Sequence, residues 1–346
     1  MKRYLRPLGI LSGSAARAAV EQGLSLPLAG GRSAFTVVEI VERSSRGTKR
    51  RIVSAPSLRE EVATCIAPRP PVGSLALEPP IVMGIINATP DSFSDRGRFR
   101  DPARAIRLGK AMLDAGARIV DIGGESTRPG ARAVPPTEEI ARIRPIVEGL
   151  RPAAETAKAL ISVDTRNART MRAALDAGAT MINDVSALTH DPAAVALASS
   201  VDVPVVLMHM PGDPETMQNQ ARYEDVALDV FDYLEARIAA CEAVGIARHR
   251  LIADPGIGFG KTGSHNLALL GRLSLFHGLG VNLLVGLSRK SFIGRLSAGE
   301  RPEERLPGSL AGAIVSLEQG VQILRVHDVP ETIQALKFAE AVGANA

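Results

Sequence analysis

Three polar side chains that each end an apolar run have the donor and acceptor pattern of a site for a flat heterocycle. Asp164, Asn183 and Asp254 stand at the ends of such runs. Carboxylates accept hydrogen bonds from amino and ring N–H groups, whereas an amide side chain both donates and accepts. Lys290, which follows a later apolar run, can donate to a carbonyl oxygen or a ring nitrogen. Any one Asp could instead cap a helix or form a salt bridge, so the prediction depends on the whole set.

A second set of side chains is suited to anions. Arg325 and His327 are two residues apart in a predicted strand, so we expect both to face the same side of it. Together with Arg128 they predict a phosphate or diphosphate site. Asn87 can ligate a hard cation such as Mg²⁺, which prefers oxygen ligands and the phosphates of a substrate. No His-x-His or His-Glu-x-x-His spacing supports zinc.

Two loop segments add to these sets. In Ser288-Arg-Lys-Ser-Phe-Ile-Gly294 we predict a short helix that begins at Ser291, where N–H groups and a hydroxyl would attract a carboxylate. The Gly-rich segment from Asp254 to Thr262 lacks the spacing of a phosphate-binding P-loop. We interpret it as a tight loop that carries Phe259.

The elements that must position these residues repeat one unit of short apolar strand, polar loop and helix. The predicted strands are Ile81–Asn87, Arg118–Ile122, Leu160–Asp164, Met181–Asp184, Val203–His209, Leu251–Asp254, Leu283–Leu287 and Val321–His327. The predicted helices are Asp101–Ala115, Thr137–Leu150, Asn167–Ala177, Asp191–Ser199, Tyr223–Val244, Ser264–Phe276, Pro307–Gln319 and Val329–Val342.

Eight strands alternating with eight helices in about 265 residues predict an α/β fold of the (β/α)₈ or TIM-barrel type. An open doubly wound sheet is the alternative, but no Gly-x-Gly-x-x-Gly follows a first strand. A barrel places its chemistry at the C-terminal ends of the strands. Polar residues stand at all of these ends: Asn87, Asp121, Asp164, Asn183-Asp184, His209, Asp254, Ser288–Lys290 and Arg325–His327.

Residues 1–80 precede the barrel, which we place at residues 81–346, and suggest no chemistry. We predict a small α+β appendage there, with a partly disordered tail as the alternative. Its expected parts are a strand at 34–42 paired with 50–54, a short helix at 58–66 and a Pro-rich linker at 67–73.

The composition excludes several classes of protein. A hydrophobic content of 45% with 23% charged residues is typical of a globular protein with a core. The net charge of +4 is scattered and has no aromatic stacking platform beside it, which argues against a nucleic-acid binder. No apolar run reaches the roughly 20 residues that span a membrane. Two distant cysteines, Cys65 and Cys241, and the absence of a secretory leader lead us to expect a cytoplasmic protein.

Residues 81 to about 342 resemble the dihydropteroate synthase family of the folate pathway, the target of sulfonamides. The motifs that carry the resemblance are Gly84-Ile-Ile-Asn-Ala-Thr-Pro-Asp-Ser-Phe-Ser-Asp95, Asp121-Ile-Gly-Gly-Glu-Ser-Thr-Arg-Pro-Gly130, Ser162-Val-Asp-Thr165, Ile182-Asn-Asp184, Leu207-Met-His-Met210, Asp254-Pro-Gly-Ile-Gly-Phe-Gly-Lys261, Gly286-Leu-Ser-Arg-Lys-Ser291 and Arg325-Val-His-Asp328. The first two are highly specific as a pair.

The resemblance implies a transferase that joins 4-aminobenzoate to 6-hydroxymethyl-7,8-dihydropterin diphosphate. The products would be 7,8-dihydropteroate and diphosphate, with Mg²⁺ as cofactor, and family members are usually homodimers. It also implies closing loops at 89–99 and 126–131. Arg96 departs from the family pattern, because a Gly is common at this position.

The resemblance further implies a role for each candidate site residue. The pterin would be held by Asp164, Asn183, Asp254 and Lys290, with Arg325 and Val326 beside it. Asn87 would bind Mg²⁺, while Arg128, Arg325 and His327 would bind the diphosphate. The aminobenzoate pocket would be formed by Thr127, Pro129, Phe259 and Ser291. Asp164, Asp254, Lys290 and Arg325 are the predicted catalytic residues.

Two other functions are compatible with a pterin-binding barrel. A pterin-dependent corrinoid methyltransferase would keep the Asp and Asn set, but it would need neither the first-loop motif nor Ser288–Ser291, and both are present. A non-catalytic pterin-binding relative would have lost Asn87, Arg128, Lys290 or Arg325, and the sequence keeps all of them.

Overall fold

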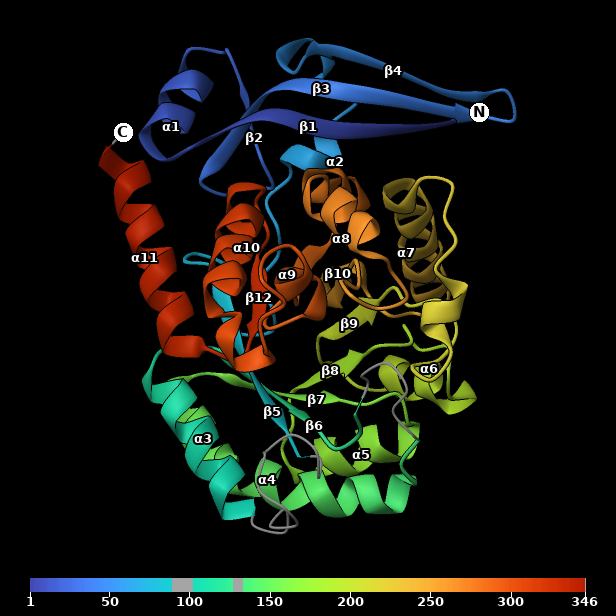
Figure 1. The fold of residues 1–346 in the computed structure, drawn as a ribbon, viewed down its shortest axis with the longest axis vertical. Helices are drawn as coiled ribbons and strands as arrows, with labels where there is room; N and C mark the ends of the chain where they lie inside the picture. Colours follow the sequence, from blue (N-terminus) through green and yellow to red (C-terminus); the bar gives the residue numbers. More distant parts are fainter. Residues whose placement is uncertain (89–101, 127–132, 346) are drawn as a thin grey trace.

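The barrel predicted from the repeating unit is present. The computed structural model describes residues 1–88, 102–126 and 133–345, and Figure 1 shows their arrangement. Eight parallel strands close in the order β10-β11-β12-β5-β6-β7-β8-β9. Their bounds are β5 Ile81–Asn87, β6 Ile119–Gly123, β7 Leu160–Asp164, β8 Met181–Asp184, β9 Val205–Met208, β10 Leu251–Asp254, β11 Asn282–Val285 and β12 Ile323–Val326.

Helices follow the strands around the barrel. They are α3 Pro102–Asp114, α4 Pro136–Ala157, α5 Ala168–Ala177, α6 Pro192–Ser199, α7 Val226–Ala243, α8 Gly263–Leu270, α9 Ser291–Arg295, α10 Leu306–Glu318 and α11 Val329–Asn345. Short 3₁₀ turns lie at Met217–Gln220, Arg248–Arg250, Leu273–Leu279 and Pro302–Glu304. The (β/α)₈ prediction is therefore confirmed, and the short helix predicted at Ser291 is α9.

Two helices differ from the prediction. We expected one helix to end at Leu150, but α4 runs through Pro152 to Ala157 because its buried face continues to Ala154. Packing of that face outweighs the hydrogen bond that a proline removes. The helix predicted at 264–276 is split, since α8 ends at Leu270 with Gly271 as its C-cap and the chain resumes as a 3₁₀ turn at Leu273.

Alternate residues of the barrel strands form an apolar layer inside the barrel. This layer consists of Ile81, Met83, Ile119, Leu160, Met181, Val206, Ile252, Leu284 and Ile323. Val72, from the segment predicted to be an extended linker, pairs with Leu75 just beyond it, and both pack into the same layer. That segment therefore plugs the barrel interior.

Residues before this plug form the predicted α+β appendage, and the alternative of a disordered tail is wrong. Its antiparallel sheet has the order β1-β3-β2, and β4 pairs with β3 as expected. The elements are β1 Lys2–Ser12, α1 Gly13–Glu21, β2 Leu26–Pro27, β3 Ser33–Ser44, β4 Gly47–Ser54, the 3₁₀ turn Pro56–Leu58 and α2 Ala63–Ile66. In Figure 1 the appendage (blue) lies across one side of the barrel, where β1 contacts the Leu273–Leu279 turn and α1 contacts α11.

Sequence patterns missed β1 and α1 in the appendage. β1 contains Pro7, Gly9 and three basic residues, so its apolar positions do not alternate cleanly. It is a strand because it pairs with β3 over nearly its whole length, from Lys2 opposite Arg43 to Ser12 opposite Ser33. The helix expected at 58–66 is reduced to a 3₁₀ turn followed by the four-residue α2. Within the described part of the chain, no helix is long and apolar enough to cross a membrane.

Candidate active site

The alternation of side chains along the strands determines which polar residues enter the barrel mouth. Residues two positions apart in a strand face the same side of the sheet. Because Ile119, Met181, Ile252 and Ile323 face the interior, the polar residues that follow them by two positions face it as well. These residues are Asp121, Asn183, Asp254 and Arg325. Leu160 of β7 also faces the interior, and Asp164, four positions later at the end of the same strand, therefore faces it as well.

Arg325 is the centre of a hydrogen-bond network in this mouth. Its Nε donates to Oδ2 of Asp121 at 2.6 Å, and its Nη2 donates to Oδ2 of Asp164 at 2.7 Å. Oδ2 of Asp121 also accepts from Nδ2 of Asn183 at 3.0 Å. Charge-assisted bonds of this kind are short and strong, and two of them orient the guanidinium plane. The network therefore fixes the positions of side chains from four strands.

Two buried carboxylate oxygens in the network remain available to accept hydrogen bonds. Oδ1 of Asp121 and Oδ1 of Asp164 have no hydrogen-bond partner among the described residues. A buried acceptor without a partner carries a desolvation cost of about 1–3 kcal/mol, which a ligand donor removes. Since Nδ2 of Asn183 is used by Asp121, the amide oxygen of Asn183 is left to accept as well. The mouth thus presents several acceptors to a ligand rich in N–H groups.

Burial shifts the protonation of the carboxylates at the mouth. Burial raises the pKa of Asp164 to about 7; Arg325 opposes the rise, whereas the charge of Asp121 adds to it. Burial also raises the pKa of Asp254, against the opposing effects of the Gly256 N–H, Lys290 and Arg325. The Gly256 N–H donates to Oδ1 of Asp254 at 2.7 Å. Shifts of this kind at a cleft mark a functional site.

Lys290 follows β11 at the same mouth, between Asp254 of β10 and Arg325 of β12. Its Nζ is 4.1 Å from the centroid of the Phe259 ring and donates to the backbone oxygen of Ile257. Burial lowers the pKa of Lys290 to about 7, although Asp254 favours the charged form. This ammonium group can therefore act as a donor or lose its proton near neutral pH. Phe259 covers it with an aromatic face, as a cation–π contact.

The remaining predicted residues are more dispersed. Asn87 is the last residue of β5, is partly buried and lies opposite Gly123 of β6. His327 follows β12, and its Nδ1 is 3.1 Å from Oγ of Ser288. Ser291 begins α9, where its hydroxyl accepts from Arg295 at 3.3 Å, and Val326 is buried at the end of β12. Thr127, Arg128 and Pro129 lie outside the described residues, as do Arg96, the expected loop 89–99 and all but Ser126 of the loop 126–131.

Two polar residues at strand ends, Asp184 and His209, have structural partners instead of facing the mouth freely. Asp184 accepts from Ser186 and Leu188 and so forms a turn. Nδ1 of His209 is 2.9 Å from Nζ of Lys261. Burial keeps the pKa of His209 well below its usual value. Lys261 also donates to the backbone oxygen of Phe259 at 2.9 Å.

Asp121 and Lys261 were not among the predicted site residues, although both organise the site. Asp121 is fully buried and lies two positions before the end of β6, on the inward side. That position in the strand was the available signal. Lys261 gave no comparable signal, because its role follows from the folded shape of the loop after β10.

The described residues contain no group of three or more His, Cys, Asp or Glu side chains able to hold a metal ion. The amide oxygen of Asn87 at the barrel mouth remains a hard ligand, which suits a cation held mostly by substrate phosphates.

The chain is similar to proteins of known activity. The sequence profile of the family named "Pterin binding enzyme" matches residues 83–327. The dihydropteroate synthase of Escherichia coli K12 is 48% identical over 268 residues, covering 78% of this chain and 93% of the relative. A solved structure of Xanthomonas albilineans dihydropteroate synthase with 4-aminobenzoic acid has a TM-score of 0.73 and 48% identity, covering 78% of this chain and 95% of that one. The X. albilineans enzyme in complex with 7,8-dihydropteroate has a TM-score of 0.71 and 44% identity, with coverages of 80% and 99%.

Proposed function

Since the chain belongs to the pterin-binding enzyme family and is a dihydropteroate synthase, we propose that its polar barrel mouth binds the pterin diphosphate, transfers the pterinylmethyl group to the amino nitrogen of 4-aminobenzoate and releases free diphosphate. The observation that carries this assignment is the pair of buried, unpartnered oxygens on Asp121 and Asp164. The amino group and ring N–H groups of a pterin supply the donors that these oxygens lack. The relatives named above decide against the methyltransferase alternative.

The pterin lies, in this proposal, between the carboxylates and the cations of the mouth. Asp164, Asn183 and Asp254 accept from the pterin N–H groups, and Lys290 donates to its carbonyl oxygen or a ring nitrogen. Arg325 stacks or bonds at the pterin edge while Asp121 and Asp164 hold it in place. Support comes from the short bonds that already orient these groups, because a preorganised site loses little entropy on binding.

The reaction is a substitution at the pterin methylene carbon. The bond from this carbon to the diphosphate oxygen breaks, and a bond to the amino nitrogen of 4-aminobenzoate forms as that nitrogen loses a proton. We propose that bond breaking leads, so that positive charge spreads into the pterin ring. Asp164 and Asp254 stabilise this charge, and Arg325, His327 and Arg128 stabilise the leaving diphosphate. The arylamine is largely neutral at pH 7 and attacks without a dedicated strong base.

Mg²⁺ fits the residues of this mouth. Asn87, at the end of β5, would hold it through the amide oxygen, with the substrate diphosphate supplying further ligands. When bound, the cation would neutralise charge on the leaving group. The absence of a three-ligand cluster in the described part of the chain supports a cation that arrives with the substrate.

The aminobenzoate pocket is proposed beside Phe259. Phe259 offers its ring face and Ser291 a hydroxyl at the first turn of α9, while Thr127 and Pro129 would complete the wall. Phe259 is close to Lys290, which is assigned to the pterin, and this supports the position of the pocket. The arylamine must approach the pterin methylene, so its pocket has to lie next to the pterin edge.

We also propose that the protein is a homodimer in the cytoplasm. Exposed apolar side chains support a covered face on adjacent helices: Leu267 of α8, Val315 of α10, and Phe338 and Val342 of α11. Helix α10 contacts both α8 and α11. Two buried cysteines without a disulfide, Cys65 and Cys241, suit a reducing compartment.

Incubation of the purified protein with the pterin diphosphate, labelled 4-aminobenzoate and Mg²⁺ tests the activity. We expect dihydropteroate and diphosphate in equal amounts, with strong losses of turnover in Asp164→Asn and Arg325→Ala. Release of no dihydropteroate by the wild type would refute the function. Full turnover and unchanged substrate binding in both variants would refute the residue roles.

A further inference from the structure

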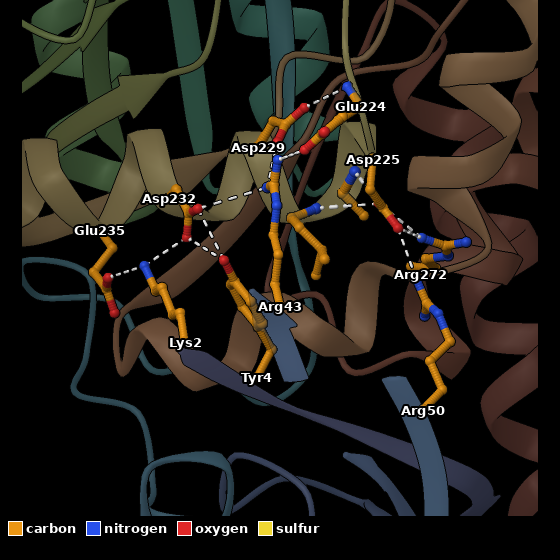
Figure 2. Close-up of polar contacts among 12 residues, drawn as sticks. Lys2, Tyr4, Arg43, Arg50, Glu224, Asp225, Asp229, Asp232, Glu235 and Arg272 are labelled. Carbon is orange, nitrogen blue, oxygen red and sulfur yellow. Dashed lines mark hydrogen bonds and ion pairs between the residues drawn. The ribbon is translucent and has the colours of Figure 1, made fainter. Parts of the chain in front are cut away.

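The appendage is held to the beginning of α7 by ion pairs, which Figure 2 shows. Arg43 of β3 donates to Asp229 and forms an ion pair with Glu224. Arg50 of β4 donates to Oδ2 of Asp225 at 2.7 Å. The family profile begins at residue 83, so both arginines lie outside the region that it matches.

These ion pairs are made at the corner where the chain enters α7, by residues just before and within its first turn. Asp225 is the N-cap of α7 and accepts from the backbone N–H groups of Ala227 and Leu228. Arg272 also binds Asp225, at 2.8 and 2.9 Å. The side chains of Arg43 and Asp225 are 23% and 19% exposed, so their pairs are screened less than open surface pairs. The appendage therefore restrains the position of this corner.

The corner is connected directly to the wall of the active site. Tyr223, two residues before the N-cap, donates its hydroxyl to the backbone oxygen of Gly260 at 2.9 Å. Its ring also packs near that of His209, with centroids 5.9 Å apart. His209 and the Phe259 carbonyl share the buried Nζ of Lys261. A continuous set of contacts thus runs from the appendage to the loop that carries Phe259.

We propose that Arg43 and Arg50 are positioning residues for the aminobenzoate pocket, acting through the start of α7 and Tyr223 on the loop 256–262. This proposal rests on the proposed function, because it assigns Phe259 to that pocket. It gives the appendage a role in catalysis as well as in packing. Most of the pterin side of the mouth is held by the Asp121–Arg325 network, and only Asp254 and Lys290 contact the loop, at Gly256 and Ile257. Pterin binding is therefore expected to depend on the appendage less than aminobenzoate binding does.

The test compares Arg43→Ala/Arg50→Ala with Arg3→Ala in the full-length protein. Arg3 belongs to the same sheet but pairs with Glu61 inside the appendage, which makes it a matched control. We expect the double variant to raise KM for 4-aminobenzoate by about three- to tenfold, with a smaller rise in KM for the pterin diphosphate. Arg43→Lys should restore part of the loss. Hydrogen exchange at backbone amides of residues 256–262 should become about threefold faster or more.

Tyr223→Phe removes the connecting hydroxyl and tests the route. It should raise KM for 4-aminobenzoate by itself and add little to the double variant, because both changes break one chain of contacts. A lower melting temperature with unchanged KM and unchanged exchange in the loop would overturn the proposal. Arg50→Ala alone, which leaves the Arg43 pairs intact, covers the case in which the double variant does not fold. Exchange needs no turnover, so an inactive wild type would refute the function without deciding this inference.

Discussion

Asp121 provides the most direct test of how the mouth is organised. Its Oδ2 accepts two hydrogen bonds, from Arg325 at 2.6 Å and from Asn183 at 3.0 Å, and its side chain is fully buried. Asp121→Asn keeps the shape of the side chain but removes its charge. The new amide oxygen can still accept both bonds at the position of Oδ2, but the amide nitrogen then stands at the position of Oδ1 and faces a ligand donor. The acceptor for a ligand N–H is therefore lost, and the pair with Arg325 is no longer ionic.

The size of the effect follows from the lost charge and the lost acceptor. A hydrogen bond to a charged group contributes about 1.5–3 kcal/mol. We expect a loss of this size in stabilisation of the transition state, which corresponds to a fall of about 10- to 150-fold in kcat/KM for the pterin diphosphate. The pH dependence should change as well. Because the charge of Asp121 helps to raise the pKa of Asp164, Asp121→Asn should move the acidic limb of the rate profile to lower pH.

Diphosphate release at saturating 4-aminobenzoate, measured across pH, gives both quantities. Asp114→Asn is a suitable control, since Asp114 is an exposed residue at the end of α3. The reasoning is refuted if Asp121→Asn retains kcat/KM within twofold of the wild type, with the acidic limb unmoved. A lower melting temperature alone would assign Asp121 to stability only.

Three further predictions concern the mouth and the plug. The profile of kcat/KM against pH should be bell-shaped, with both limbs near pH 7. Asp164 is protonated and loses its negative charge below its pKa of about 7, and Lys290 loses its proton above its pKa of about 7. Lys290→Arg should move only the basic limb, to higher pH, and a flat profile from pH 5 to 9 would contradict both assignments. Asp254→Asn should raise KM for the pterin diphosphate by about tenfold or more, measured by initial rates, and an unchanged KM would exclude Asp254 from the pterin site. Leu75→Ala should lower the free energy of unfolding in urea by about 2–5 kcal/mol with both KM values unchanged, because the plug packs below the mouth; a change in KM would contradict that separation.

Sequence patterns predicted the convergence of the main site residues for a simple reason. In a closed parallel barrel the C-terminal strand ends meet at one mouth, and alternation determines which side chains face inward. Asp164, Asn183, Asp254 and Arg325 satisfy both conditions, and the apolar residues two or four positions earlier satisfy the second. Local periodicity was therefore enough to predict that these four side chains share the barrel mouth.

The partners within the mouth could not be predicted in the same way. Arg325 and Asp121 are 204 residues apart and lie on β12 and β6, which β5 separates in the barrel. Their bond depends on the stagger of three strands and on the length of the arginine side chain. The role of Lys261 depends on loop geometry at three left-handed glycines, Gly256, Gly258 and Gly260. Neither feature produces a periodic pattern in the sequence.

The distribution of charge across the mouth fits a reaction in which diphosphate departs first. The carboxylates Asp121, Asp164 and Asp254 outnumber the cations Arg325 and Lys290 by three to two, so the pterin end of the mouth is acidic when all are ionised. Arg325 lies between Asp121 and Asp164, and these carboxylates raise its pKa although its burial acts against the charge. In the proposed reaction Arg325 would therefore stay charged as the anion departs, and the carboxylates would stabilise the cation that forms. Charges that are fixed in place before the bond breaks stabilise its separated state more than its ground state, which is the condition for catalysis by electrostatic preorganisation.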